Sequence, residues 1–258
     1  MTVSNLSALL TFTFCLPAAL LITHDGWSIK YRLLSASVLL LGLAKLSRYR
    51  PVADTVIEPL TTAITGIHNI PIAIAITFAI GGYSCILLSL INDHRVLRWT
   101  VGTLLTLTIS FLVTFPFSYG SRFSGRISED GITSPVQIIF WSLPLFLVLS
   151  VNCSLVILCA MELRSKTSSV LLPAGVCTSG VSGIVYATSK VAQLVISSNA
   201  PTSPLLSTAT LVSLLSLPFS AIAIALVVYS SAARALIDRL SRYRSLRKYD
   251  STKSRRES

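Results

Sequence analysis

Four polar side chains occur inside or at the edge of long apolar segments, where chemistry is least expected. Lys190 and Tyr186 lie in VYATSKVAQLV, Asn152 lies in LSVNCSLV, and His68 lies in TGIHNIP. Polar groups at membrane depth usually face the interior of a helix bundle or a water-filled cavity, or they bond across helices. We therefore take Asn152, Lys190, Tyr186 and His68 as candidates to line a solute-binding cavity.

Three of these residues also have a simpler interpretation. Lys190 lies about seven residues, or roughly 10 Å, from the outer end of its predicted helix. Its long side chain can therefore reach the membrane surface, and a cavity that attracts anions is the alternative. Asn152 can serve as a single interhelical hydrogen bond. His68 falls at the outer membrane boundary, where its charge can respond to mildly acidic pH.

The sequence contains none of the common catalytic patterns. HExxH, GxSxG and the P-loop are absent, and none of the ten acidic residues lies deep in a predicted membrane helix. The five cysteines all fall in apolar segments without a CxxC pair, so we expect reduced core residues rather than a metal or redox centre. We predict no catalytic residue, no metal, no cofactor and no enzymatic activity, and the missing carboxylates also disfavour proton-coupled transport.

The elements that position these groups follow from composition. The mean hydropathy is +0.74 and only 12% of residues are charged, against about 25% in soluble proteins. The apolar segments are long enough to cross about 30 Å of hydrocarbon as helices. We predict an all-α membrane bundle, residues 1–231, with seven transmembrane helices over about Val3–Thr23, Tyr31–Leu46, Pro71–Asn92, Trp99–Ser118, Pro135–Met161, Val170–Ser197 and Leu205–Ser231.

The distribution of lysine and arginine predicts the orientation. With the C-terminus in the cytoplasm, six basic residues in loops and nine in the tail make 15 inside, against five outside. This excess predicts an external N-terminus, a cytoplasmic C-terminus and a multi-pass plasma-membrane location. If the short second helix failed to span, the split would be 13 against seven.

The segment at about 51–67 precedes the third predicted span. Val52, Val56, Leu60 and Ile64 recur every fourth residue, which predicts an external helix lying in the interface or partly re-entrant. Gly66 can end this helix. Asn69 or a neighbour can cap the next one, with Pro71 in its first turn.

The tail, residues 232–258, combines apolar residues at helical spacing with a run of cations. Six of its nine cations are taken as the membrane-binding residues: Arg234, Arg239, Arg242, Arg244, Arg247 and Lys248. Such a helix should lie along the inner leaflet, where each basic residue gains about 1 kcal/mol from anionic lipid head groups. A topology anchor is one interpretation and a docking site for a cytoplasmic regulatory partner is another. We expect no nucleic-acid binding, because no recognition motif surrounds the tail.

Small residues and prolines indicate how the helices pack. A ridge of small residues recurs every fourth position in the sixth predicted helix: Gly175, Ser179, Gly183 and Ala187. Such a ridge permits close helix contact, either within the bundle or in a homodimer. Pro17, Pro144 and Pro218 occur in similar settings, CLPA, SLPL and SLPF, where each removes a backbone donor and can form a hinge.

The chain also resembles an actinobacterial family of multi-pass membrane proteins described as transporters without an assigned function. The resemblance rests on RLLSASVLLLGLAKL, ITGIHNIPIAIAIT and NDHRVLRWT, with Arg32, Gly66, Asn69, Arg95 and Arg98 as matching residues. The resemblance implies a seven-helix, transporter-like protein but no substrate, and we expect the chain to bind or move a small solute through the bundle. The alternative is a sensor or interaction protein that signals through the last helix and tail. A polar cavity reached by Asn152 and Lys190 would favour transport.

Overall fold

A computed structural model describes residues 3–23, 27–47, 49, 51, 53–68, 70–91, 93–115, 135–164, 170–199 and 204–254. Helices make up all the regular structure in these ranges. In chain order they are α1 (Val3–Cys15), α2 (Pro17–Ile22), α3 (Ile29–Leu46), η1 (Ala53–Ile57), α5 (Glu58–Thr65), α6 (Ile70–Leu90), α7 (His94–Thr114), α9 (Pro135–Arg164), α10 (Leu171–Asn199) and α11 (Pro204–Ser254).

Six stretches are long and apolar enough to cross a membrane: Asn5–Ile22, Ile70–Leu90, His94–Thr114, Ser142–Leu163, Leu171–Gln193 and Pro204–Asp238. The prediction of an all-α chain is confirmed for the described residues, and the six stretches are candidate membrane spans by their length and composition. The second predicted span, which corresponds to α3, is not among the six, because its 18 residues include Lys30, Arg32 and Lys45.

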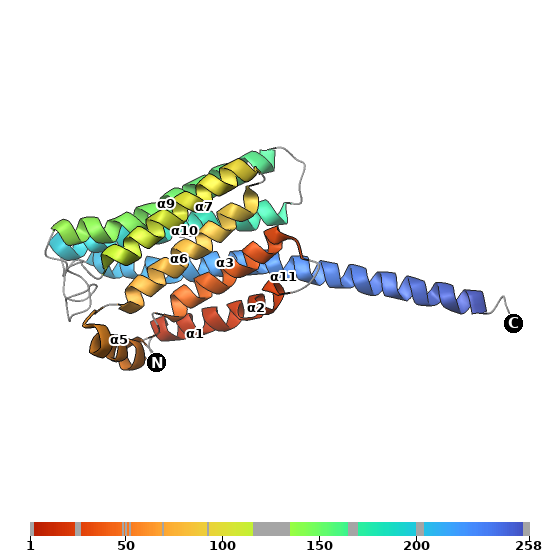
Figure 1. Ribbon diagram of the computed structural model, residues 1–258, viewed down its shortest axis with the longest axis horizontal. Coiled ribbons are helices and arrows are strands. Elements are labelled where there is room, and N and C mark those ends of the chain that lie inside the picture. Colours follow the sequence, from red (N-terminus) through yellow and green to blue (C-terminus); the bar gives the residue numbers. More distant parts are fainter. Residues whose placement is uncertain are drawn as a thin grey trace.

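Helix α3 nevertheless lies inside the bundle. It runs between α1 and α6 and beside α11 (Figure 1). Leu34, Val38, Leu41 and Ala44 are fully buried along its length. Gly82 of α6 comes so close that a Cβ there would lie 2.8 Å from Leu41 Cγ. The hydrophobic core therefore forms around α3 as much as around the more apolar helices.

The second half of the chain forms a group in which α10 packs against both α9 and α11. Helix α7 is peripheral: it packs against α6, and only 11% of its membrane window is buried. Leu104 and Phe111 are the buried residues of α7. Most of its apolar surface is therefore free to contact lipid.

Helix α11 continues well beyond the bundle along its long axis (Figure 1). It is one helix of 51 residues that includes most of the basic tail. The tail is thus helical, as the residue spacing predicts. Its direction differs from the predicted one along the inner leaflet, because a helix that continues the axis of a span cannot lie flat without a bend.

The segment before α6 forms η1, a single turn of π-helix, followed by α5. Gly66 ends α5 in the left-handed conformation, with φ 67°, and its N–H donates to Thr62 O. This is the stop expected of glycine at that position. Pro71 is the second residue of α6, as predicted, whereas Asn69, which the sequence offers as a cap, lies outside the described residues.

Candidate functional site

A cluster of buried hydroxyl groups lies where α6, α10 and α11 meet. Ser179 of α10 and Ser220 of α11 are both fully buried, and their Oγ atoms are 2.6 Å apart. Ser220 Oγ also lies 3.1 Å from the Ser179 carbonyl oxygen, to which it can donate. Two hydrogen-bonded hydroxyls at this depth join α10 to α11 across a closely packed interface.

Tyr83 of α6 adds a third hydroxyl to this cluster. The side chain is fully buried, and its hydroxyl lies beside Ser220, close to but outside hydrogen-bond geometry, and near Tyr186. It has no partner at hydrogen-bond geometry. A buried polar atom without a partner is uncommon in native proteins, because its desolvation is not compensated.

Asn152 of α9 supplies a second unpartnered atom. The residue is fully buried, and its Nδ2 donates to Val148 O of the same helix at 2.8 Å. Its Oδ1 accepts no hydrogen bond. The interhelical bond considered from the sequence is therefore not formed. Instead, the amide lies over Gly183 of α10, where a Cβ would be 2.3 Å from Oδ1.

The ridge of small residues on α10 is used inside the bundle. Gly175 faces Val227 of α11, Ser179 bonds to Ser220, and Gly183 receives the Asn152 amide. Ala187 is buried as well. The ridge therefore lies between α9 and α11, which leaves it covered by helices of the same chain.

Lys190 lies one helical turn beyond Tyr186 on α10. Its ammonium is partly buried, and Nζ donates to Gln193 Oε1 at 2.6 Å. Gln193 is the residue nearer the end of the helix, so the lysine side chain extends towards that end. This is the direction that a snorkelling lysine takes. Tyr186 itself is buried, at 4% exposure, so the two residues differ in their access to solvent.

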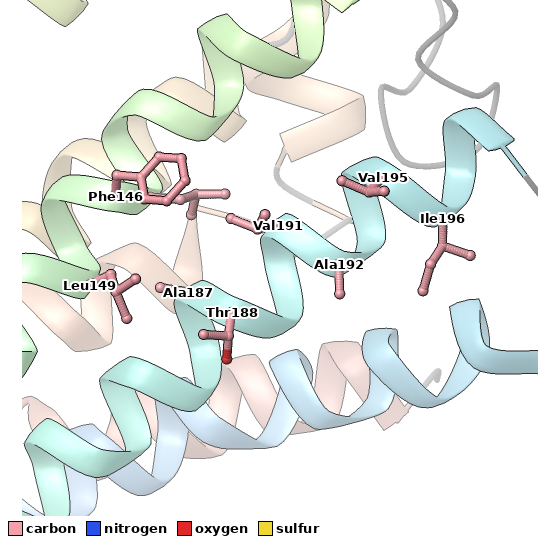
Figure 2. Close-up of a pocket in the computed structure, with 9 residues that line it drawn as sticks. Phe146, Leu149, Ala187, Thr188, Val191, Ala192, Val195 and Ile196 are labelled. Atoms are coloured by element: carbon pink, nitrogen blue, oxygen red, sulfur yellow. The ribbon is translucent and has the colours of Figure 1, made fainter.

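A groove of about 410 Å³ lies between α9 and α10 (Figure 2). Its lining is apolar apart from Thr188, and it includes Leu145, Leu149, Ala187, Val191 and Val195. The volume falls in the range of about 300–1,000 Å³ that is usual for small-molecule sites. Of the four cavity candidates from the sequence, Asn152, Lys190, Tyr186 and His68, none lines this groove.

Lys45 is a buried cation whose role sequence reasoning missed. In the charge count from the sequence, Lys45 is one of the five basic residues outside, at the end of the second predicted span, where its side chain would reach water. The structure instead leaves it 5% exposed, with Nζ donating to Leu214 O of α11 at 2.9 Å. The signal that points to this contact is Pro218, because a proline removes the donor for the carbonyl four residues earlier.

His68 lies just after the helix stop at Gly66 and is partly exposed. Its Nδ1 is 3.5 Å from Glu58 Oε1 and 3.4 Å from Thr62 Oγ1. The histidine therefore connects the start of α6 to α5, and when protonated it forms an ion pair with Glu58. The sequence placed His68 on the rim but did not identify Glu58 as its partner.

The basic residues of the tail lie on the long extension of α11. Arg234 is exposed, and the backbone at Arg239, Arg242, Arg244, Arg247 and Lys248 is helical. The side chains of these last five residues lie outside the described part of the chain. Their binding to anionic lipid remains a prediction.

Over the described ranges, no group of three or more His, Cys, Asp or Glu side chains is placed to hold a metal ion. Comparison with protein-family models, with curated proteins and with solved structures finds no match to this chain. The candidate site therefore rests on the geometry of its own residues.

Proposed function

We propose that this chain is a seven-helix, transporter-like plasma-membrane protein that binds a small solute in the middle of the bundle. The proposal is carried by two fully buried atoms, Tyr83 Oη and Asn152 Oδ1, which have no hydrogen-bond partner in the described part of the chain; Ser35 Oγ and Ser84 Oγ are further buried atoms of this kind. In a purely structural bundle such atoms would be paired or replaced by apolar groups. A solute that bonds to them would compensate their desolvation, and polar groups at membrane depth commonly mark solute pathways.

The position of the hydroxyl cluster supports the same proposal. Tyr83, Ser179 and Ser220 come from three helices that also contribute to the core. Their contacts to one another involve no charged group, which suits a neutral solute with hydroxyl or amide groups. Because the cluster is closely packed, binding requires α10 to move against its neighbours, and the smooth ridge on α10 suits such sliding.

A test uses proteoliposomes and a panel of radiolabelled sugars, amino acids and nucleosides. For the solute that is taken up, Asn152→Ala and Tyr83→Phe should each raise the half-saturating concentration about fivefold, the effect of one lost hydrogen bond. Tyr229→Phe is the matched control, because that hydroxyl bonds to Phe14 O outside the cluster. Absence of uptake across the panel, or equal effects of all three substitutions, would contradict the proposal.

The seven-span topology, with an external N-terminus, is part of the proposal. The burial of α3 among the spans supports it, since a helix outside the membrane would not pack along α6 and α11. In a background without native cysteines, an impermeant maleimide should label Thr65→Cys in intact cells. Thr65 follows the C-terminal end of α3, whereas Ser28 directly precedes its N-terminal end. Ser28→Cys should therefore react only after permeabilisation. If both sites react from the same side, α3 does not span.

A sensor or interaction protein is the second candidate, and the length of α11 favours it. At 1.5 Å per residue its 51 residues extend about 76 Å, well beyond a bilayer core of about 30 Å. A continuous helix of this length can transmit a change in the bundle to a cytoplasmic partner, or to anionic head groups, at the tail. A cytoplasmic protein that co-purifies only when residues 234–258 are present, together with no solute uptake, would support this candidate.

A further inference from the structure

Pro218 interrupts the backbone hydrogen bonding of α11 inside the membrane window Pro204–Asp238. Proline has no N–H, so the carbonyl of Leu214, four residues earlier, has no donor within the helix. In hydrocarbon an unpaired carbonyl is costly, since water is not available to replace the missing donor. The bonding of Leu214 O therefore matters for the shape of α11.

Lys45 donates to this same carbonyl. Its Nζ lies 2.9 Å from Leu214 O, and the residue is 5% exposed. Lys45 is on α3, 169 positions away in the chain, so the bond joins two helices that pack side by side. Lys45 lies near the end of α3, from which its side chain could reach the membrane surface. Instead it points inward, to the carbonyl that Pro218 releases.

The neighbouring hydroxyls on α11 are committed elsewhere. Ser213 Oγ donates to Thr210 O, and Ser216 Oγ donates to Ser213 O. Hydroxyls bonded back to the carbonyls of their own helix favour bending of that helix. This stretch of α11 therefore contains a proline and two serines that bond back to their own helix, and all three favour bending of the helix. Despite this, α11 remains one helix from Pro204 to Ser254.

A second proline break has an interhelical bond close to it, although this bond does not go to Thr13 O, the carbonyl that Pro17 releases. At Pro17 the first span is divided into α1 and α2, and Tyr229 Oη of α11 donates to Phe14 O beside the break at 2.7 Å. The rings of Phe14 and Tyr229 also pack edge to face. Side chains from other helices thus bond to backbone carbonyls near two prolines of this bundle, and at Pro218 the bonded carbonyl is the one that the proline releases.

We propose that Lys45 is a conformational lock for α11: its ammonium replaces the hydrogen bond that Pro218 removes and so prevents α11 from bending at that proline. Release of Lys45 leaves Leu214 O without this donor, and α11 then bends so that the carbonyl can reach another donor. Because α11 continues into the tail, the bend moves residues 232–254 relative to the bundle. This device operates whether the protein transports a solute or signals.

The experiment measures the distance between spin labels at Thr208→Cys and Ala233→Cys, two exposed positions on either side of Pro218. It uses the full chain in lipid nanodiscs, with the native cysteines replaced. The labelled positions are about 38 Å apart along a straight helix. With Lys45 present the distance distribution should be narrow. Lys45→Met, which keeps the length but removes the donor, should broaden the distribution, because a hinge at Pro218 lets the two parts of α11 adopt a range of angles.

Two further variants separate the lock from a general loss of packing. Lys45→Arg keeps a cationic donor and should retain the narrow distribution. Pro218→Ala restores the backbone donor for Leu214 O, so the double variant K45M/P218A should again be narrow. A narrow distribution for K45M alone, or a double variant as broad as K45M, would overturn the proposal. If K45M does not fold, recovery of the folded double variant supports the lock, and failure of both contradicts it.

Discussion

Gly183→Ala is expected to destabilise the bundle by about 3 kcal/mol or more, because it combines overpacking with the loss of a buried hydrogen bond. The new Cβ would lie 2.3, 2.4 and 2.5 Å from the Oδ1, Cγ and Nδ2 atoms of Asn152. The amide cannot remain there, so either Asn152 gives up its bond to Val148 O or α9 and α10 separate. Thermal unfolding in detergent micelles measures the loss.

A second substitution decides whether Asn152 is the cause. Asn152→Ala removes both the amide that clashes and the unpartnered Oδ1, so its own effect on stability should be small. The double variant G183A/N152A should therefore be close to wild type, and far more stable than Gly183→Ala alone. Gly102→Ala is the matched control, since a Cβ at Gly102 meets nothing within 4 Å. Equal losses in the single and double variants would show that the clash lies elsewhere.

Gly175→Ala is expected to lower stability by about 2 kcal/mol, the usual effect of overpacking a core contact. Its Cβ would lie 2.2 Å from Val227 Cγ2 and 3.3 Å from the backbone oxygen of Ala223, both on α11. Val227 is buried, and β-branched side chains have one strongly preferred rotamer in a helix, so it cannot simply turn aside. The measurement is the midpoint of thermal unfolding, with the Tyr229→Phe variant as a reference for modest change.

Val227→Ala tests this contact directly. In the double variant G175A/V227A the new methyl fills space that the valine leaves, so stability should return most of the way to wild type. The adjacent carbonyl of Ala223 cannot move without α11, and this limits the recovery. If the loss of stability in G175A/V227A equals the sum of the losses in the two single variants, Gly175 and Val227 do not contact each other in the folded protein.

Several features could be predicted from the sequence because they depend on local chemistry. Long apolar segments must be helical in lipid, since each backbone group needs a partner within its own segment. Gly66 adopts the left-handed conformation that ends α5, and Pro71 lies in the first turn of α6, as their residue types predict. The carbonyl that Pro218 releases can also be identified by counting four residues back.

Tertiary structure decided which groups meet. From its position near the end of an apolar segment, Lys45 was assigned to the membrane surface, but the packing of α3 against α11 directs it to Leu214 O. Asn152 was expected to bond across helices. Because Gly183 presents only backbone at the contact, the amide bonds within α9 and its oxygen is left without a partner.

Helix α3 also shows the difference between what the sequence predicts and what the packing decides. Hydropathy counts its three cations and leaves it outside the six clear candidate spans, whereas the fold buries it in the core and gives Lys45 a partner from another helix. That the chain forms long apolar helices able to cross a membrane can be read from the sequence, because length and apolarity are properties of each segment. Only the tertiary structure decided where its polar groups lie, because burial and hydrogen bonding belong to pairs of helices far apart in the chain.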